Sequence, residues 1–240
     1  MVLPRKLADS SELAAWRLQR MDRQNSVSVA CLNRLGRIEE KRLAKSTGRT
    51  MRVQLRIVAG SLRGRKLSCE VSESLRPAPQ MVREALFSIL GTGVPDRPFY
   101  DLFAGTGAVG MEAISRGAAS VTLVERDTRQ AGAIRKYLDQ FKVADRAEVV
   151  RGDVYRWGEA WPGVMEPVNI FLGPPFADFQ TKMDQLVRLV TDLQKKTVPG
   201  SVIILQTEGD VAEDAFPGKW DVRRYGRNKL RFWEHEHDRA

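Results

Sequence analysis

The sequence has few cysteines and lacks long apolar runs. Its two cysteines, Cys31 and Cys69, supply neither a disulfide framework nor a pair at metal-ligand spacing, which suits a reducing cytoplasm, and we expect no metal site. No stretch of about eighteen apolar residues is present, so no membrane span is expected. The first thirty residues carry charges throughout, without the apolar centre of a secretory signal. We therefore expect a cytoplasmic protein.

Acidic residues are scarce in the first part of the chain. Residues 1–66 hold 16 lysines and arginines against 5 acidic residues, a net charge of +11, whereas the remaining 174 residues hold 23 against 25, a net charge of −2. A near-neutral domain behind a basic segment is typical of polyanion-binding proteins, because phosphate contacts supply affinity that does not depend on sequence. For residues 1–50, a solvated basic extension is an equally good interpretation.

A basic β-hairpin is predicted at residues 51–75. Apolar residues alternate loosely from Arg52 to Leu67, and no acidic residue lies between Arg52 and Lys66. Positive charge also protects exposed edge hairpins from aggregation, but the lack of any acid favours contact with RNA. The candidate RNA-binding residues of this hairpin are Arg56, Arg63, Arg65 and Lys66.

A helix is predicted after the prolines at 77 and 79, because apolar residues recur on one helical face at Val82, Leu86, Ile89 and Leu90. Most of that helix is scaffold. Arg76, Arg83 and Glu84 fall outside the apolar stripe, where they face either a ligand or solvent. The two arginines complete the set of RNA-binding candidates.

The chain is organised around the stretch from Phe99 to Ala113. A short apolar and aromatic run indicates a buried strand, and Gly105, Gly107 and Gly110 follow at once, before helix-forming residues. Glycines suit such a turn because the backbone must visit positive φ, and because a missing Cβ lets main-chain N–H groups touch a ligand. By itself this glycine spacing is shared by nicotinamide, flavin and S-adenosylmethionine sites.

Three further predicted strands end in polar or turn residues. Residues 120–124 run into Glu125, twenty residues after Gly105, where an acid can bind ribose hydroxyls. Residues 147–150 lead to Asp153, and residues 168–172 lead to the turn Gly173-Pro174-Pro175-Phe176. Because ligands bind beyond the carboxyl ends of strands in an open parallel sheet, we expect these turns to converge on one crevice.

Strands alternate with predicted helices along this part of the chain. Helices are expected at 128–141 and 179–196, a fifth buried strand at 201–206, and a closing hairpin over 221–234. Alternation of this kind predicts an α/β fold with a doubly wound, mostly parallel sheet, finished by an antiparallel pair.

Five motifs, in order along residues 51–234, resemble the bacterial RsmD family. They are Met51-Arg52 with the Ile57–Gly60 and Arg63–Arg65 segments, Arg76-Pro77 with Val82–Phe87, Asp101–Gly107, Pro174-Pro175-Phe176, and Tyr225-Gly226. Members of this family are S-adenosylmethionine-dependent methyltransferases that modify a guanine N2 in 16S, small-subunit ribosomal RNA. The resemblance implies a Rossmann-like, seven-stranded class I methyltransferase sheet in a domain spanning residues 76–240.

The resemblance also implies roles for matching positions. The loop from Asp101 to Gly107 is expected to hold the methionine end of the cofactor, Glu125 the ribose and Asp153 the adenine. The implied cofactor-binding residues are Asp101, Phe103, Ala104, Gly105, Thr106, Gly107, Glu125, Arg126, Asp153 and Val154. The implied catalytic residues, which receive the target base, are Gly173, Pro174, Pro175 and Phe176. The partner is small-subunit rRNA or an assembling 30S particle, bound by a monomer.

The sequence departs from the family pattern in two places. The family normally begins near the position of Met51, so residues 1–50 are either a lineage-specific extension or the product of an upstream start. The family also has Asp or Asn directly before Pro-Pro, where this chain has Gly173. That residue accepts a hydrogen bond from the target amine, and with glycine only the backbone carbonyl remains. Asp178 is a candidate substitute.

Three functional hypotheses remain open from the sequence. The first is a guanine N2-methyltransferase acting on small-subunit rRNA. The second is a ribosome-assembly factor that keeps the cofactor pocket and the RNA surface but has lost catalysis, which Gly173 favours. The third is a nicotinamide-dependent dehydrogenase, supported only by the glycine spacing and Glu125, and opposed by the Pro-Pro-Phe turn.

Overall fold

A computed structural model describes residues 51–71, 77–209 and 211–236. They belong to one compact unit that begins at Thr50. The predicted extension at 1–50 and the candidate Arg76 lie outside the described residues, so their proposed roles stay predictions. None of the helices in the described part of the chain is long and apolar enough to cross a bilayer.

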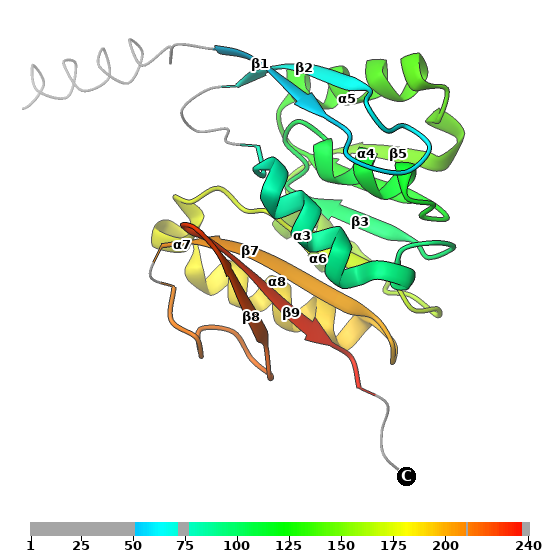
Figure 1. The fold of residues 1–240 in the computed structure, drawn as a ribbon. Coiled ribbons are helices and arrows are strands. Elements are labelled where there is room, and N and C mark those ends of the chain that lie inside the picture. The colour runs from blue at the N-terminus through cyan, green and yellow to red at the C-terminus, as the bar shows by residue number, and fades with distance from the viewer. Residues whose placement is uncertain (1–50, 72–76, 210, 237–240) are drawn as a thin grey trace, which may run out of the picture. The chain divides into compact units, whose positions relative to one another are not determined.

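Seven strands form one sheet in the order β5-β4-β3-β6-β7-β9-β8 (Figure 1). The first five of these in space are parallel to one another, and β9 runs antiparallel to both β7 and β8. The mostly parallel, doubly wound sheet that the sequence predicts is therefore confirmed. The strands are β3 (Phe99–Leu102), β4 (Val121–Glu125), β5 (Ala147–Arg151), β6 (Asn169–Leu172), β7 (Val202–Glu208), β8 (Asp221–Tyr225) and β9 (Asn228–Glu234).

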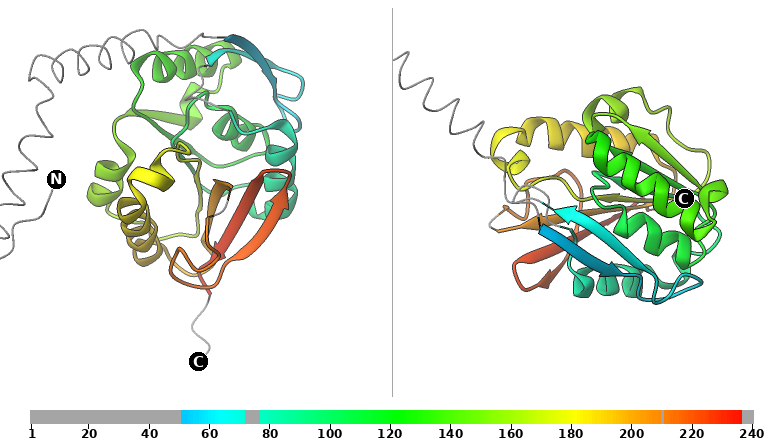
Figure 2. Two further views of the ribbon diagram at one scale, coloured as in Figure 1. Left: turned by 90° about the vertical axis from the view of Figure 1, so that its left-hand side faces the viewer. Right: turned by 90° about the horizontal axis from the view of Figure 1, so that it is seen from above.

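Helices cover both faces of the sheet. Alternate residues of each central strand point to opposite sides, so Phe171 joins the core under one helical layer, whereas Ile170 and Leu172 join the core under the other. Figure 2 shows the hairpin of β1 (Met51–Arg56) and β2 (Lys66–Val71) on the opposite face from α8 (Met183–Lys196). One layer contains α3 (Gln80–Leu90), α4 (Ala108–Ser115) and α5 (Thr128–Phe141), and the other contains α6 (Val154–Ala160) and α8 (Met183–Lys196).

The structure differs from the predicted helices in two places: one helix was missed and one predicted helix is divided. Helix α6 was not expected, because seven residues with a central glycine give little periodicity. The expected helix at 179–196 is divided into α7 (Asp178–Thr181) and α8, since Lys182 has φ −138° and ψ 28°, outside the helical region. Short 3-10 turns also occur at Gly91–Gly93 and Ala144–Arg146.

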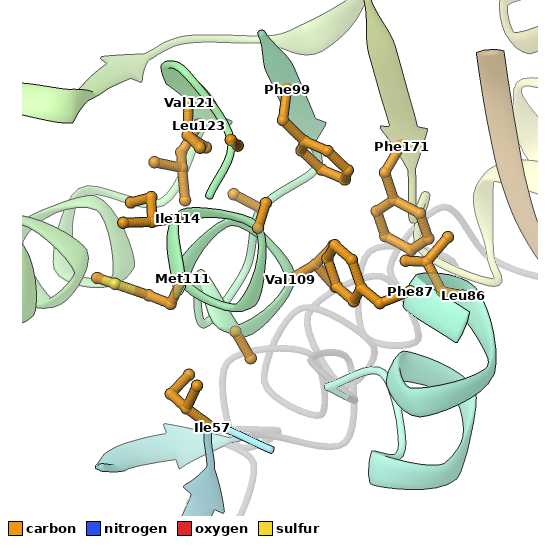
Figure 3. Close-up of a cluster of buried hydrophobic side chains, with 14 of the residues drawn as sticks. Ile57, Leu86, Phe87, Phe99, Val109, Met111, Ile114, Val121, Leu123 and Phe171 are labelled. Carbon is orange, nitrogen blue, oxygen red and sulfur yellow. The ribbon is translucent and has the colours of Figure 1, made fainter. Parts of the chain in front are cut away.

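The hairpin predicted near the start of the domain is formed by β1 (Met51–Arg56) and β2 (Lys66–Val71). Its loop packs against the C-terminal end of α4: Leu62 donates its backbone N–H to the Ser115 hydroxyl at 2.9 Å. A Cβ on Gly60 would lie 1.8 Å from the Ser115 carbonyl oxygen, so only glycine fits there. In Figure 3, Ile57 from this hairpin faces α4, which carries Met111 and Ile114.

Arg83 does not reach a ligand or solvent, which corrects its assignment as an RNA-binding residue. Its side chain is 1% exposed and lies 3.4 Å from the carboxylate of Glu112, which is fully buried in α4. The Glu112 carboxylate also accepts the backbone N–H groups of Val58 and Ala59 at 2.8 and 3.0 Å, and pairs with Arg116 at 2.9 Å. We call these groups the Glu112 cluster. It joins α3, α4 and the hairpin.

Candidate functional site

The glycine-rich turn follows β3 and precedes α4. Gly105 and Gly107 have φ of 55° and 72°, as the expected tight turn requires. Phe103, at the start of the turn, also has a positive φ of 65°, which is strained for a bulky residue. The fully buried Asp101 carboxylate accepts the backbone N–H of Gly110 at 2.8 Å. Burial is the largest influence on this carboxyl and raises the pKa of Asp101 to about 7.

Two more carboxylates lie at the ends of the neighbouring strands. Glu125 accepts the backbone N–H groups of Gly105 and Asp127, both at 2.7 Å, and so ties the turn after β3 to the turn after β4. Asp153 follows β5 and caps α6 by accepting the N–H groups of Tyr155 and Arg156 at 3.0 and 3.2 Å. Backbone hydrogen bonds therefore hold both side chains in fixed positions.

The turn after β6 is fixed at its far end by a buried side-chain pair. Asp178, only 6% exposed, accepts a hydrogen bond from the Tyr155 hydroxyl at 2.7 Å, and Lys182 lies 3.8 Å from the same oxygen. Burial first, and then Asp178, raise the pKa of Tyr155, so the phenol stays protonated as the donor. In contrast, the Phe176 ring is 50% exposed.

These four turns line a single open groove of about 1820 Å³. Binding cavities for one small molecule commonly hold about 300–1,000 Å³, so the groove has room for a cofactor and part of a second ligand. Its far side is formed by the end of β7, residues 206–209, and by the turn between β8 and β9, residues 224–229. Among the described residues, no three side chains of His, Cys, Asp or Glu gather as a metal site.

The structure brings most of the predicted site residues together. All the cofactor candidates except Gly107 line the groove, as do the four residues of the Gly173–Phe176 turn. Gly107 instead lets the glycine-rich turn pack closely against Ile134 of α5, because a Cβ on Gly107 would lie 2.9 Å from the Ile134 side chain. The hairpin candidates do not line the groove, although all four are exposed: Arg56, Arg63, Arg65 and Lys66.

Sequence reasoning missed several parts of the groove, among them Tyr155 and the β8–β9 turn. Tyr155 had no signal, since its helix was not predicted. The β8–β9 turn was predicted as a hairpin, but nothing in its pattern placed it beside the Gly173–Phe176 turn. That position follows from β9 lying between β7 and β8 in the sheet.

Comparisons with known proteins agree with this architecture. Ribosomal RNA small subunit methyltransferase D of Escherichia coli (strain K12) is 35% identical over 172 residues, which cover 71% of this chain and 83% of that protein. The solved structure of a putative methyltransferase, yhhF, from Escherichia coli has a TM-score of 0.62 and 32% identity, covering 77% of this chain and 99% of that one.

A more distant solved structure shows likeness of fold alone. It is an RNA methyltransferase from Salinibacter ruber in complex with S-adenosyl-L-homocysteine, with a TM-score of 0.50, 20% identity, and coverage of 69% of this chain and 97% of that one. The family model described as "Conserved hypothetical protein 95" matches residues 55–234, from the first strand of the hairpin to the last strand of the sheet. This chain therefore belongs to the RsmD family.

Proposed function

We propose that this protein methylates small-subunit ribosomal RNA with S-adenosylmethionine, at the N2 atom of a guanine. One observation carries the proposal: the glycine-rich turn, Glu125 and Asp153 share one groove with the Gly173–Phe176 turn. A groove of that size admits a cofactor beside a target nucleotide. The names of the Escherichia coli relative and of the solved methyltransferases support the reaction class.

The chain's own groups fit the proposed cofactor. Asp101 would face the cationic amino group of the methionine end. The Glu125 carboxylate uses two of its roughly four acceptor positions on backbone N–H groups, which leaves others for ribose hydroxyls. Asp153 and Val154, at the start of α6, would lie against the adenine. The bound cofactor supplies the electrophilic methyl group.

The Gly173–Phe176 turn would receive the target base. The half-exposed Phe176 offers a ring on which an extruded base can stack, as aromatic side chains commonly do for unpaired nucleotides. A guanine N2 amine carries two N–H bonds, and acceptors that take them orient the nitrogen toward the methyl group. At Gly173 only a backbone carbonyl is available, so catalysis is slower than with an acidic side chain.

The decisive experiment incubates the purified protein with labelled S-adenosylmethionine and small-subunit particles that lack the modification. Transfer to a guanine N2, identified by mass spectrometry of the nucleosides, supports the proposal. Particle binding without transfer would favour the second candidate function, a ribosome-assembly factor with lapsed catalysis, which Gly173 favours. Transfer to another atom would contradict the proposed guanine N2 specificity.

Calorimetric titration should show binding of S-adenosylmethionine and S-adenosylhomocysteine, and no binding of NAD. The glycine-rich turn, Glu125 and Asp153 are the groups proposed to hold S-adenosylmethionine. The Pro-Pro-Phe turn, which lines the same groove, opposes a nicotinamide site. Glu125→Ala should weaken binding of both compounds, since it removes the acceptor for the ribose. Tight binding of NAD with no response to S-adenosylmethionine would contradict the proposal.

Cofactor affinity should rise by about tenfold between pH 5.5 and 7. The pKa of Asp101 is raised to about 7, so this carboxyl is mostly protonated at pH 5.5 and becomes ionised as the pH rises. Only the ionised form attracts the ligand's amino group, so binding tracks the ionised fraction. Titration of S-adenosylhomocysteine across this range measures the effect. In Asp101→Asn the affinity for S-adenosylhomocysteine should no longer change with pH. If the affinity of this variant depends on pH as strongly as that of the wild type, Asp101 is not the source of the effect.

A further inference from the structure

The four hairpin cations that the sequence predicts to bind RNA, Arg56, Arg63, Arg65 and Lys66, do not line the groove. Helix α4 begins at the glycine-rich turn and spans eight residues, about 12 Å along its axis. The hairpin loop packs against Ser115, at the opposite end of α4 from the groove. The loop cations Arg63 and Arg65 therefore lie on the side of the domain away from the site.

A different group of cations lines the groove. Among the described residues, six lysines and arginines line the groove: Arg52, Arg126, Arg129, Arg224, Arg227 and Lys229. Three of them come from the β8–β9 turn. Most of the carboxylates in the groove belong instead to the ends of β3, β4 and β5, where the cofactor is proposed to bind.

Gly209 links the β8–β9 turn to the neighbourhood of Phe176. Gly209, at the end of β7, donates its backbone N–H to the Arg227 carbonyl oxygen at 3.4 Å. A Cβ built on the same Gly209 would lie 3.5 Å from the Phe176 ring. One residue thus separates the aromatic ring from the turn that carries Arg227. Figure 1 shows that turn at the same end of the sheet as α7, which follows Phe176.

The strand register places the other two cations of the β8–β9 turn, Arg224 and Lys229, at the same end of the sheet. Lys229 lies opposite Arg224 in the β8–β9 pair and opposite Thr207 in the β7–β9 pair. Arg224 and Arg227 are exposed, and Lys229 is half-buried. Among ion pairs between described residues, Arg224 joins Glu213 at 3.3 Å, with both side chains largely exposed, which is a weak contact that a phosphate can replace.

We propose that the β8–β9 turn, through Arg224, Arg227 and Lys229, binds the RNA phosphates that flank the target nucleotide. The inference rests on the proposed function and extends it to a surface that the sequence did not indicate. A base can stack on Phe176 only if its own backbone follows it into the groove, and that backbone then passes the adjacent turn. Phosphate contacts of this kind fix register and orientation, while the base is recognised elsewhere.

The test compares two double variants that each remove two positive charges. Arg227→Gln with Lys229→Gln alters the β8–β9 turn, and Arg63→Gln with Arg65→Gln alters the distant hairpin loop as a matched control. Binding of small-subunit particles lacking the modification is measured over a range of monovalent salt at constant Mg²⁺. In the first variant the slope of log affinity against log salt should fall by about 1.4, or 0.7 for each lost contact to a single strand.

Both variants should bind S-adenosylhomocysteine with wild-type affinity, which verifies that the groove is intact. A wild-type slope in the β8–β9 variant, or an equal loss of slope in both variants, would overturn the inference. Because binding is measured without turnover, the inference can fail while the enzyme methylates normally. Failure of the proposed function itself would appear separately, as a wild-type protein that transfers no methyl group to the particles.

Discussion

Glu112→Ala is expected to lower the free energy of unfolding by about 3–5 kcal/mol, the usual cost of removing one partner of a buried ion pair. The side chain is fully buried and accepts from two backbone N–H groups and two arginines. Truncation would leave the Arg83 guanidinium buried beside an empty space. Burial already lowers the pKa of Arg83, and without Glu112 only the smaller influence of Glu84 opposes that shift.

The Arg83→Met variant should lose less stability than Glu112→Ala. Glu112 would keep Arg116 and the N–H groups of Val58 and Ala59, and a methionine fills much of the arginine's volume without a buried charge. Denaturant unfolding measures the free energy of unfolding of both variants. Asp221→Ala serves as a control, because the exposed pair of Asp221 with Arg223 contributes at most about 1 kcal/mol. Equal losses in the two cluster variants would contradict this account of the Glu112 cluster.

Gly173→Asp should raise methyl transfer roughly 10- to 150-fold. The added carboxylate would accept a hydrogen bond from the target amine, and a bond to a charged group contributes about 1.5–3 kcal/mol. Each ~1.4 kcal/mol of transition-state stabilisation is about tenfold in rate. Cofactor affinity should change little, because the groups proposed to hold the cofactor lie at the ends of β3, β4 and β5.

The structure has space for this substitution. Gly173 has no positive φ, and a Cβ there would lie 3.2 Å from the tip of the Phe171 ring, which need move by only a few tenths of an ångström. Gly173→Ala is the matched control, since it adds the same Cβ without an acceptor. Single-turnover methylation of particles lacking the modification measures the change.

A gain in the Asp variant and none in the Ala variant supports the acceptor argument. No gain over an active wild type would mean that another group already holds the amine. Asp178 would then be tested, although the Tyr155 hydroxyl occupies one of its oxygens. Asp178→Asn, which keeps an acceptor for Tyr155, would lower transfer if Asp178 serves this purpose.

The parts of the fold that local patterns encode could be predicted. Helix α5 begins and ends where its periodicity indicates, and the glycine-rich turn, Glu125 and Asp153 converge because carboxyl ends of parallel strands share one edge. The predicted buried face of α3 was right for Val82 and Leu86 but wrong for Ile89, which is 44% exposed. The observed face also includes Arg83 and Phe87, so Arg83 was misplaced. Its partner Glu112 is 29 residues away, beyond any local pattern.

The far side of the groove could not be predicted for a related reason. A hairpin over 221–234 is visible in the sequence, but the same pattern fits a sheet in which β8 lies next to β7. The observed register instead places β9 against β7, with Glu208 opposite Asn228. That choice depends on the packing of Leu230 and Phe232 into the core, which only the assembled structure displays.

The position of β9 between β7 and β8 also sets when a growing chain can complete its fold. β8 pairs only with β9 in this sheet, so β7 presents an open edge until β9 has been synthesised. At about 5–20 residues per second, the roughly 20 residues between β7 and β9 take one to a few seconds to make. Until β9 is in place on the released chain, the unpaired N–H and C=O groups of β7 can recruit a strand from another chain. Pairing of β9 with β7 covers this edge and at the same time brings Arg227 close to Phe176.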